Sequence, residues 1–439
     1  MKIDPFTHMN MPESVVCPAD KSLTHRAIIF SGIAAGKSRI ENPLLGEDCL
    51  STISCLEKLG VDVSVDQDGN QVFVDSPGID HFLNPKTPLD CGNSGTTARL
   101  LIGLLSSCPQ LTVVLTGDES LRQRPMGRVV QPLREVGAMI DGPENGNKFP
   151  LSIKGVSIRE ADFHIDKATA QVKSALLLAS LRTSGAVSIT LPVGSRDHTE
   201  KLLAEQGARI SVIRDQGLEK IVFHGPFLPV ARSYQVPVDP SSAAFFCVLV
   251  LLRSSGELTL PHVLANPTRV GFLRVLERMT DAISVEHEEI GSYMEPVMSI
   301  RVRGGRPLKP VMISSEEVPT LIDEIPILAV AASYGDGESS FHGLDELRVK
   351  ESDRLSGTQE MLQAAGIDCR ISEKSSLIIK GRPGVAAKNF SFHSRDDHRL
   401  AMAAAVLART TQKDGAWIEN SSCVDISFPG FFELLEACR

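Results

Sequence analysis

The chain has 439 residues, and 45 lysines and arginines against 54 aspartates and glutamates give a formal net charge of −9. At this length two domains are expected, and a 42% hydrophobic content is that of a soluble globular protein. The acidic balance argues against a nucleic-acid partner, and the longest apolar run, residues 243–252, is too short to cross a bilayer.

The cysteines and the N-terminus predict a cytoplasmic protein. The nine cysteines are spread singly, without a C-x-x-C pair, so neither a zinc ribbon nor a disulfide framework is expected. Residues 1–10 mix charge and proline without an apolar stretch, so we expect no signal peptide. Both features fit a reducing compartment.

The first predicted helix carries a cluster of cations. Pro18 stops any strand, Ser22 is a good N-cap, and residues 23–35 have a helical pattern. Lys21 would then lie at the positive end of a helix, where backbone N–H groups also favour a phosphate. A plain capped helix with Lys21 and Arg26 facing solvent fits the pattern equally well.

Three further segments offer groups that could contact a ligand. Residues 91–101 place two glycines and Asn93 before an apolar helix, although a turn with a helix cap explains them equally well. Arg124 is held in extended geometry by the following proline, which suits an arginine directed into a cleft. Thr169 and Gln171 precede another apolar helix and could hydrogen-bond hydroxyl groups.

A helix that ends near a glycine and leads into a strand recurs along the chain. The glycines are typical of helix C-caps, and the alternation after them is typical of strands. The spacing of roughly 70–85 residues is longer than solenoid periods, so each unit should hold several strands and helices. The alternative is a common α/β connection without a true repeat. The copies are predicted at residues 56–65, 133–140, 202–210 and 361–371, with a degenerate one at 276–283.

Two prolines, Pro237 and Pro240, interrupt the pattern before a long apolar helix and predict a hinge. The chain would pass between the two domains a second time at residues 17–20. We therefore expect one domain from residues 1–17 together with 240–439, and a second from residues 18–239.

The C-terminal half supplies the acids. Residues 323–324 precede a helix, where a negative charge is favoured. Lys350 and Arg354 would share one helix face, and a bound anion would offset their repulsion. Local neutralisation by Glu351 and Asp353 is the alternative.

Together and in this order, the segments from Pro18 to Phe432 resemble the 5-enolpyruvylshikimate-3-phosphate (EPSP) synthases. The resemblance implies transfer of the enolpyruvyl group of phosphoenolpyruvate to the 5-hydroxyl of shikimate-3-phosphate, with release of phosphate, in the shikimate pathway to chorismate and aromatic amino acids. It implies no metal or organic cofactor. The implied fold is α/β (α+β): two similar globular domains, each of three β-α-β-α-β-β units in an inside-out α/β barrel. The active site would lie in the cleft between the domains of a monomer.

The resemblance also implies a role for each candidate residue. Asp323 would be the general base at the 5-hydroxyl and Glu351 the proton donor to the enol carbon, with Lys21 and Lys350 also catalytic. The residues implied to bind shikimate-3-phosphate are Lys21, Ser22, Arg26, Thr169, Ala170, Gln171, Arg196, Asp323 and Lys350. Those implied to bind phosphoenolpyruvate are Lys21, Asn93, Gly95, Arg124, Gln171, Glu351, Arg354, His398 and Arg399.

Three positions depart from the pattern of the family. Ala19 stands where glycine is usual, which makes the backbone there less permissive. Thr169 stands where serine is usual and keeps the hydroxyl. A C-terminal lysine found in many members falls on Ile426, so one phosphate contact is absent or is supplied by another residue.

Residues 196–200 and 266–269 resemble signatures of the class II branch of the family, which includes glyphosate-tolerant enzymes. Gly95, however, stands where a tolerant pattern has alanine, whose methyl group would crowd the inhibitor. We therefore expect measurable inhibition by glyphosate.

Two other interpretations stay open. The sister family that transfers enolpyruvyl to UDP-N-acetylglucosamine has a pattern with asparagine after the first lysine and a reactive cysteine before the arginine of the loop. Here Ser22 follows Lys21, and residues 116–123 contain no cysteine. A non-catalytic binder of small anions would have lost the acids, whereas Asp323 and Glu351 are both present.

Overall fold

The computed structural model describes residues 1–6, 11–66, 71–288, 295–372, 375–384, 386–412 and 414–438. The chain divides into two compact units. Unit 1 contains Met1–Pro18 and most of the chain after Pro237, and unit 2 contains Ala19–Val236. The chain thus passes between the units at residues 18–19 and 236–237, whereas the prolines predicted crossings at 17–18 and 239–240.

Unit 2 contains three four-stranded sheets, ordered β13-β2-β4-β3, β5-β6-β8-β7 and β11-β12-β10-β9. In each sheet one outer pair is parallel and the other two pairs are antiparallel. The strands are β2 (Gly36–Glu41), β3 (Asp62–Val65), β4 (Gln71–Ser76), β5 (Leu89–Asp90), β6 (Thr112–Thr116), β7 (Met139–Asp141), β8 (Leu151–Lys154), β9 (Ala161–His164), β10 (Gly185–Pro192), β11 (Arg209–Asp215), β12 (Leu218–Gly225) and β13 (Ser233–Gln235).

Unit 1 also contains three sheets, ordered β14-β16-β15, β17-β18-β20-β19 and β1-β22-β21. The first strand of the chain, β1, pairs with β22, the last strand. The four-stranded sheet repeats the parallel and antiparallel pairing seen in unit 2. The strands are β1 (Lys2–Ile3), β14 (Glu257–Leu264), β15 (Ile283–His287), β16 (Val297–Arg303), β17 (Met312–Ile313), β18 (Glu338–Phe341), β19 (Asp368–Ile371), β20 (Leu377–Lys380), β21 (Phe390–His393) and β22 (Ala416–Glu419).

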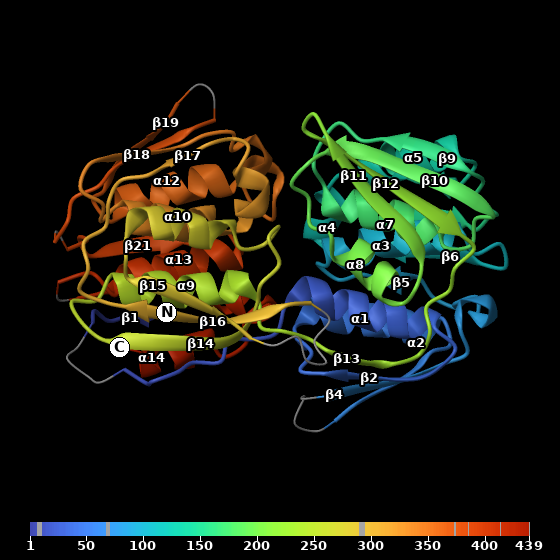
Figure 1. Cartoon of the computed structure of the whole chain (residues 1–439), viewed down its shortest axis with the longest axis horizontal. Helices are drawn as coiled ribbons and strands as arrows, with labels where there is room; N and C mark the ends of the chain where they lie inside the picture. Colours follow the sequence, from blue (N-terminus) through green and yellow to red (C-terminus); the bar gives the residue numbers. More distant parts are fainter. Residues whose placement is uncertain are drawn as a thin grey trace. The chain divides into compact units, whose positions relative to one another are not determined.

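Three apolar helices are almost wholly buried in each unit, and the sheets and more polar helices surround them (Figure 1). In unit 2 they are α1 (Lys21–Ile33), α3 (Gly95–Ser106) and α7 (Ala170–Ser180), and in unit 1 they are α9 (Pro240–Leu251), α11 (Ile325–Ala332) and α13 (His398–Ala408). The other helices are α2 (Glu47–Lys58), α4 (Glu119–Gln123), α5 (Gly127–Glu135), α6 (Pro143–Gly146), α8 (His198–Glu205), α10 (Gly271–Met279), α12 (Arg354–Ala364) and α14 (Phe431–Ala437). Short 3₁₀ turns are η1 (Ile79–His81), η2 (Val318–Thr320), η3 (Ile322–Glu324), η4 (Asp345–Val349) and η5 (Ser421–Ile426).

The predicted helix–glycine–strand pattern is confirmed. Helices α2, α5, α8 and α12 are followed by Gly60, Gly137, Gly207 and Gly366, each with φ between 80° and 98°, and a strand begins two residues later. Glycine adopts this left-handed conformation without the steric cost of a Cβ atom. In the degenerate copy, α10 ends at an extended Thr280 instead, before β15 begins. The mixed α/β fold with several sheets is therefore as predicted.

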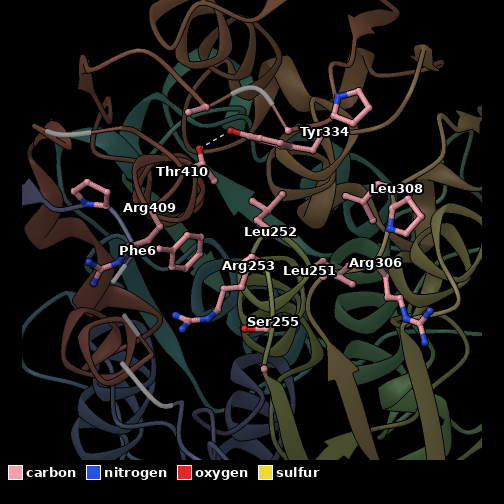
Figure 2. A pocket seen from close by; sticks show the side chains of 18 of the residues that line it. Phe6, Leu251, Leu252, Arg253, Ser255, Arg306, Leu308, Tyr334, Arg409 and Thr410 are labelled. Carbon is pink, nitrogen blue, oxygen red and sulfur yellow. Dashed lines mark hydrogen bonds between the residues drawn. The ribbon is translucent and has the colours of Figure 1, made fainter. Parts of the chain in front are cut away.

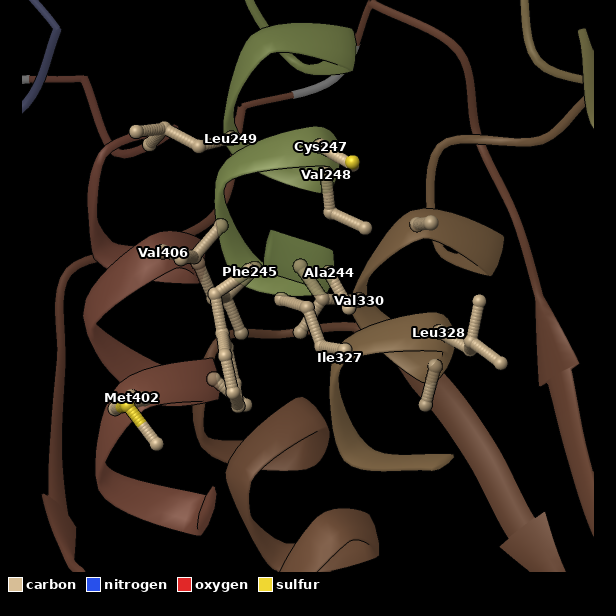
Figure 3. Packing of buried hydrophobic residues seen from close by; sticks show 14 of the residues in the cluster. Ala244, Phe245, Cys247, Val248, Leu249, Ile327, Leu328, Val330, Met402 and Val406 are labelled. Carbon is tan, nitrogen blue, oxygen red and sulfur yellow. The ribbon is translucent and has the colours of Figure 1, made fainter. Parts of the chain in front are cut away.

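Side chains of α9, α11 and α13 interlock in the core of unit 1 (Figure 3). Phe245 and Val248 of α9 lie close to Val330 of α11 and Val406 of α13, and all four are at most 1% exposed. In unit 2, α3 and α7 approach so closely that a Cβ atom at Gly103 would lie 2.1 Å from the carbonyl oxygen of Ala175. Within the described ranges, no helix has the length and apolar composition to span a membrane.

Candidate active site

Many candidate residues lie at the N-termini of the buried helices. Lys21, Gly95 and Ala170 are the first residues of α1, α3 and α7 in unit 2. In unit 1, His398 is the first residue of α13, and Asp323 lies in η3 immediately before α11. Because a helix N-terminus carries unpaired N–H groups and a partial positive charge, each unit presents a surface suited to anions.

The first residue of α1 is fixed by an aspartate cap. Asp20, rather than the predicted Ser22, caps the helix, and its Oδ1 accepts a hydrogen bond from the backbone N–H of Leu23 at 2.8 Å. The side chain of Lys21 is mostly buried, and its Nζ lies 3.0 Å from Oδ2 of Asp48 in α2. The hydroxyl of Ser22 therefore does not cap the helix.

Ser22, Arg26 and Arg196 come together in unit 2. The buried guanidinium of Arg26 donates from Nε to Oγ1 of Thr199 at 2.8 Å and from Nη2 to Oγ of Ser174 at 2.7 Å. Nη1 of Arg196 donates to Oγ of Ser22 at 3.4 Å. Two guanidinium groups and three hydroxyl groups therefore meet beside the N-terminus of α1, a set that suits a phosphate.

A second cluster surrounds the start of α3. Nη2 of Arg124 donates to Oδ1 of Asn93 at 2.6 Å, and Nη1 of Arg99 donates to Oε1 of Gln171 at 2.7 Å. A Cβ atom at Gly95 would lie 2.7 Å from Nη1 of Arg99 and 3.3 Å from Nη1 of Arg124. Arg99 was not among the predicted site residues, although its spacing of one helical turn from Gly95 places both on one face of α3.

The start of α7 joins the same cluster. Nε2 of Gln171 donates to Oγ1 of Thr96, the second residue of α3, at 3.1 Å. Thr169 occupies the N-cap position of α7, but its side chain makes no capping hydrogen bond. Thr169, Ala170 and Gln171 therefore stand at a helix N-terminus beside the start of α3.

A buried chain of hydroxyl groups connects α1 to the start of α3. Nδ1 of His25 lies 2.8 Å from Oγ1 of Thr52, which lies 2.6 Å from Oγ1 of Thr97. Thr97 donates to Oγ of Ser94, the N-cap of α3, at 2.7 Å. Burial lowers the pKa of His25 to about 3, although the carboxylate of Asp48 acts in the opposite direction.

The unfolded chain should bind a proton at His25 below about pH 6.5, whereas the folded protein binds it only near pH 3. His25 therefore does not affect the unfolding free energy above about pH 6.5, and it lowers that free energy by up to about 1.4 kcal/mol per pH unit as the pH falls from there towards 3. We expect His25→Asn to flatten the dependence of unfolding free energy on pH between about 7 and 5. Urea unfolding followed by circular dichroism measures it, with exposed His81→Gln as the control; an unchanged slope in His25→Asn would contradict the assignment.

Arg354 organises the acids of unit 1. Its side chain is 1% exposed and contacts three carboxylates. Nη1 lies 3.0 Å from Oδ1 of Asp323, Nη2 lies 2.5 Å from Oε2 of Glu351, and Nε lies 2.8 Å from Oδ2 of Asp397. Burial alone would lower the pKa of Arg354, but the three carboxylates raise it well above its usual value. Both predicted catalytic acids therefore contact one permanently charged group.

Two further cations approach Asp323. Nζ of Lys350 lies 3.4 Å from Oδ1, and Nη2 of Arg399 lies 3.9 Å from Oδ2. Nη1 of Arg399 also lies 3.6 Å from Oε1 of Glu324, whose pKa is raised by burial and lowered in part by Arg399. The buried His398 precedes Arg399 on α13. The structure thus gathers Lys350, Glu351 and Arg399 around Asp323 and Arg354.

A cavity of about 760 Å³ lies elsewhere in unit 1 (Figure 2). Arg253 donates to the carbonyl oxygen of Cys438 at 2.9 Å, and its guanidinium carbon lies 5.1 Å from the ring centre of Phe6. Arg409 donates to the carbonyl oxygen of Asp4 at 2.8 Å. These arginines connect the two ends of the chain, and none of the predicted site residues lines the cavity.

Known proteins resemble this chain over nearly its whole length. The family model described as EPSP synthase (3-phosphoshikimate 1-carboxyvinyltransferase) matches residues 8–435. The chain is 42% identical over 423 residues to the 3-phosphoshikimate 1-carboxyvinyltransferase of Desulforudis audaxviator, covering 96% of each chain. It is 44% identical over 417 residues to the enzyme of the same name from Syntrophomonas wolfei, covering 95% of each.

Solved structures share the fold. An EPSP synthase from Acinetobacter baumannii matches with a TM-score of 0.87 at 36% identity, covering all of this chain and 97% of the other. The enolpyruvyl transferase NikO from Streptomyces tendae matches with a TM-score of 0.74 at 15% identity over all of this chain and 96% of the other, a likeness of fold alone. The chain therefore belongs to the EPSP synthase family.

Proposed function

We propose that this protein transfers the enolpyruvyl group of phosphoenolpyruvate to the 5-hydroxyl of shikimate-3-phosphate and releases phosphate. The observation that carries the proposal is the contact of Asp323 and Glu351 with one buried arginine. The reaction needs a base at an oxygen and an acid at a carbon, and two adjacent carboxylates can divide these tasks. Membership of the EPSP synthase family supports the same reaction.

The substrates are anions, and the cations of both units supply the complementary charge. Arg26 and Arg196, with Ser22 and Ser174, would hold the phosphate of shikimate-3-phosphate by charge-assisted hydrogen bonds. Lys21, Thr169, Ala170, Gln171, Asp323 and Lys350 would contact the rest of that molecule. Lys21, Asn93, Gly95, Arg124, Gln171, Arg354, His398 and Arg399 would contact phosphoenolpyruvate, beside Glu351. The proposed reaction therefore needs residues from both units.

The chemistry proceeds by addition and elimination. Asp323 takes the proton of the 5-hydroxyl as its oxygen bonds to C2 of phosphoenolpyruvate, and Glu351 gives a proton to C3. The deprotonated Glu351 then takes a proton back from C3 as phosphate leaves C2 with the bonding electrons, which restores the double bond, and the proton held by Asp323 passes to the departing phosphate. Lys350 and Arg354, at 3.4 Å and 3.0 Å from Asp323, hold its carboxylate in place.

Release of phosphate from purified protein tests the proposal. Release should require both shikimate-3-phosphate and phosphoenolpyruvate. Release with UDP-N-acetylglucosamine in place of shikimate-3-phosphate would favour the sister transferase. Binding of shikimate-3-phosphate without release under any combination would favour a non-catalytic binder and contradict the proposal.

We expect Gly95→Ala to weaken phosphoenolpyruvate binding, because its methyl group would displace the guanidinium groups of Arg99 and Arg124. A displacement of this kind should weaken binding of phosphoenolpyruvate on the order of tenfold or more. Steady-state kinetics should show a higher KM for phosphoenolpyruvate, an unchanged KM for shikimate-3-phosphate and weaker inhibition by glyphosate. An unchanged KM for phosphoenolpyruvate would contradict the assignment of Gly95.

Unaltered wild-type activity in millimolar glyphosate at low phosphoenolpyruvate would contradict the expected inhibition.

We also propose that the protein acts as a monomer in the cytoplasm. All nine cysteines lie in the described ranges, and all are buried free thiols, which suits a reducing compartment. Light scattering of the purified protein tests the oligomeric state.

A further inference from the structure

A cluster of buried charges lies behind the arginines proposed to bind phosphate in unit 2. Lys173 of α7 is fully buried, and its Nζ lies 2.6 Å from Oε1 of Glu200 in α8 and 2.9 Å from Oε1 of Glu219 in β12. Both glutamates are at most 5% exposed. Because no atom of Lys173 reaches solvent, this ammonium group does not touch a substrate.

The neighbours of this cluster in the sequence are the groups that hold Arg26. Ser174 directly follows Lys173, and Thr199 directly precedes Glu200. The hydroxyl oxygens of Ser174 and Thr199 lie 2.7 Å apart. Both accept hydrogen bonds from the guanidinium of Arg26. The Lys173–Glu200 ion pair and the Ser174–Thr199 hydrogen bond therefore join α7 to α8 at two adjacent points.

The same cluster anchors the loop that carries Arg196. Oε1 of Glu219 accepts a hydrogen bond from Oγ of Ser195 at 3.2 Å, and Oε2 lies 3.4 Å from Nε of Arg214. Ser195 directly precedes Arg196, which reaches Ser22. Movement of Glu219 would therefore move the backbone from which Arg196 extends.

We infer that Lys173 is a positioning residue for recognition of the phosphate of shikimate-3-phosphate, an inference that rests on the proposed function. Its ammonium sets the spacing of α7, α8 and β12, and this spacing brings Arg26 and Arg196 to one place. Of the residues of unit 2 proposed to contact phosphoenolpyruvate, Gln171 lies on α7 with Lys173, whereas Gly95 and Arg124 do not lie on α7, α8 or β12. Loss of Lys173 should therefore affect one substrate more than the other.

The test is the binding of shikimate-3-phosphate by titration calorimetry together with the KM of each substrate. We expect Lys173→Met to weaken binding of shikimate-3-phosphate about 10- to 100-fold and to raise its KM similarly, with a much smaller change for phosphoenolpyruvate. Glu200→Gln keeps the Lys173–Glu219 pair, so it should fold and shift binding in the same direction by a smaller factor. The exposed Lys154→Met is the matched control.

The outcomes separate this inference from the proposed function. Unchanged affinity for shikimate-3-phosphate in a folded Lys173→Met or Glu200→Gln protein would overturn this inference alone. Equal losses for both substrates would do the same, because they indicate a general structural role. Wild-type protein that binds no shikimate-3-phosphate would overturn the proposed function, and this inference with it.

Discussion

Asp323→Asn and Glu351→Gln should each lower kcat by about 10²- to 10⁴-fold while the protein still binds its substrates. The amides keep the shape of the side chains but neither accept nor donate a proton as a carboxyl group does. Single-turnover release of phosphate measures the chemical step, and calorimetry with shikimate-3-phosphate measures binding. The exposed Glu316→Gln is the control and should leave both unchanged. Folded variants that keep kcat within about a few-fold would contradict the assigned roles and favour the anion binder.

The contact of Arg354 with Glu351 gives a physical reason for the timing of proton transfer. An arginine 2.5 Å away stabilises the charged form of Glu351, which cannot donate a proton. A substrate carboxylate that takes the place of Glu351 on Arg354 would remove this stabilisation. Substrate binding would then prepare Glu351 to hold the proton that we propose it gives to C3.

Local sequence features predicted the elements better than their caps. The glycines after α2, α5, α8 and α12 marked the helix ends because a left-handed residue there requires glycine. Ser22 was a wrong choice of N-cap because Asp20, two residues earlier, accepts the hydrogen bond from the backbone N–H of Leu23. Both residues are good caps, and the sequence alone does not rank them.

The predicted site residues came from a resemblance, whereas their partners depend on the tertiary fold. Asp48 and Lys173 are far in sequence from the groups that they contact, so no local pattern identifies them. Arg99 lies one helical turn from Gly95, but its contact with Gln171 joins residues 72 positions apart. Ile426, where the resemblance implied a lysine in many members of the family, packs against the core of unit 1 and supplies no charge. Arg354 was predicted to bind phosphoenolpyruvate, but only the fold shows that it joins three carboxylates of the protein.

Arg354→Met should lower the stability of unit 1 by about 3–5 kcal/mol, because it leaves Asp323, Glu351 and the fully buried Asp397 without their shared cation. The only tryptophan, Trp417 in β22, lies in unit 1, so its fluorescence in urea reports the unfolding of that unit.

The matched control for Arg354→Met is Arg303→Met, which breaks an exposed pair with Glu257 and should cost about 1 kcal/mol or less. Adding Asp397→Asn to Arg354→Met should recover part of the loss, since it removes one uncompensated charge. Equal losses in the Arg354 and Arg303 variants would show that the buried charge of Arg354 has no special role. A loss that Asp397→Asn does not reduce would attribute the effect to packing of the arginine stem instead.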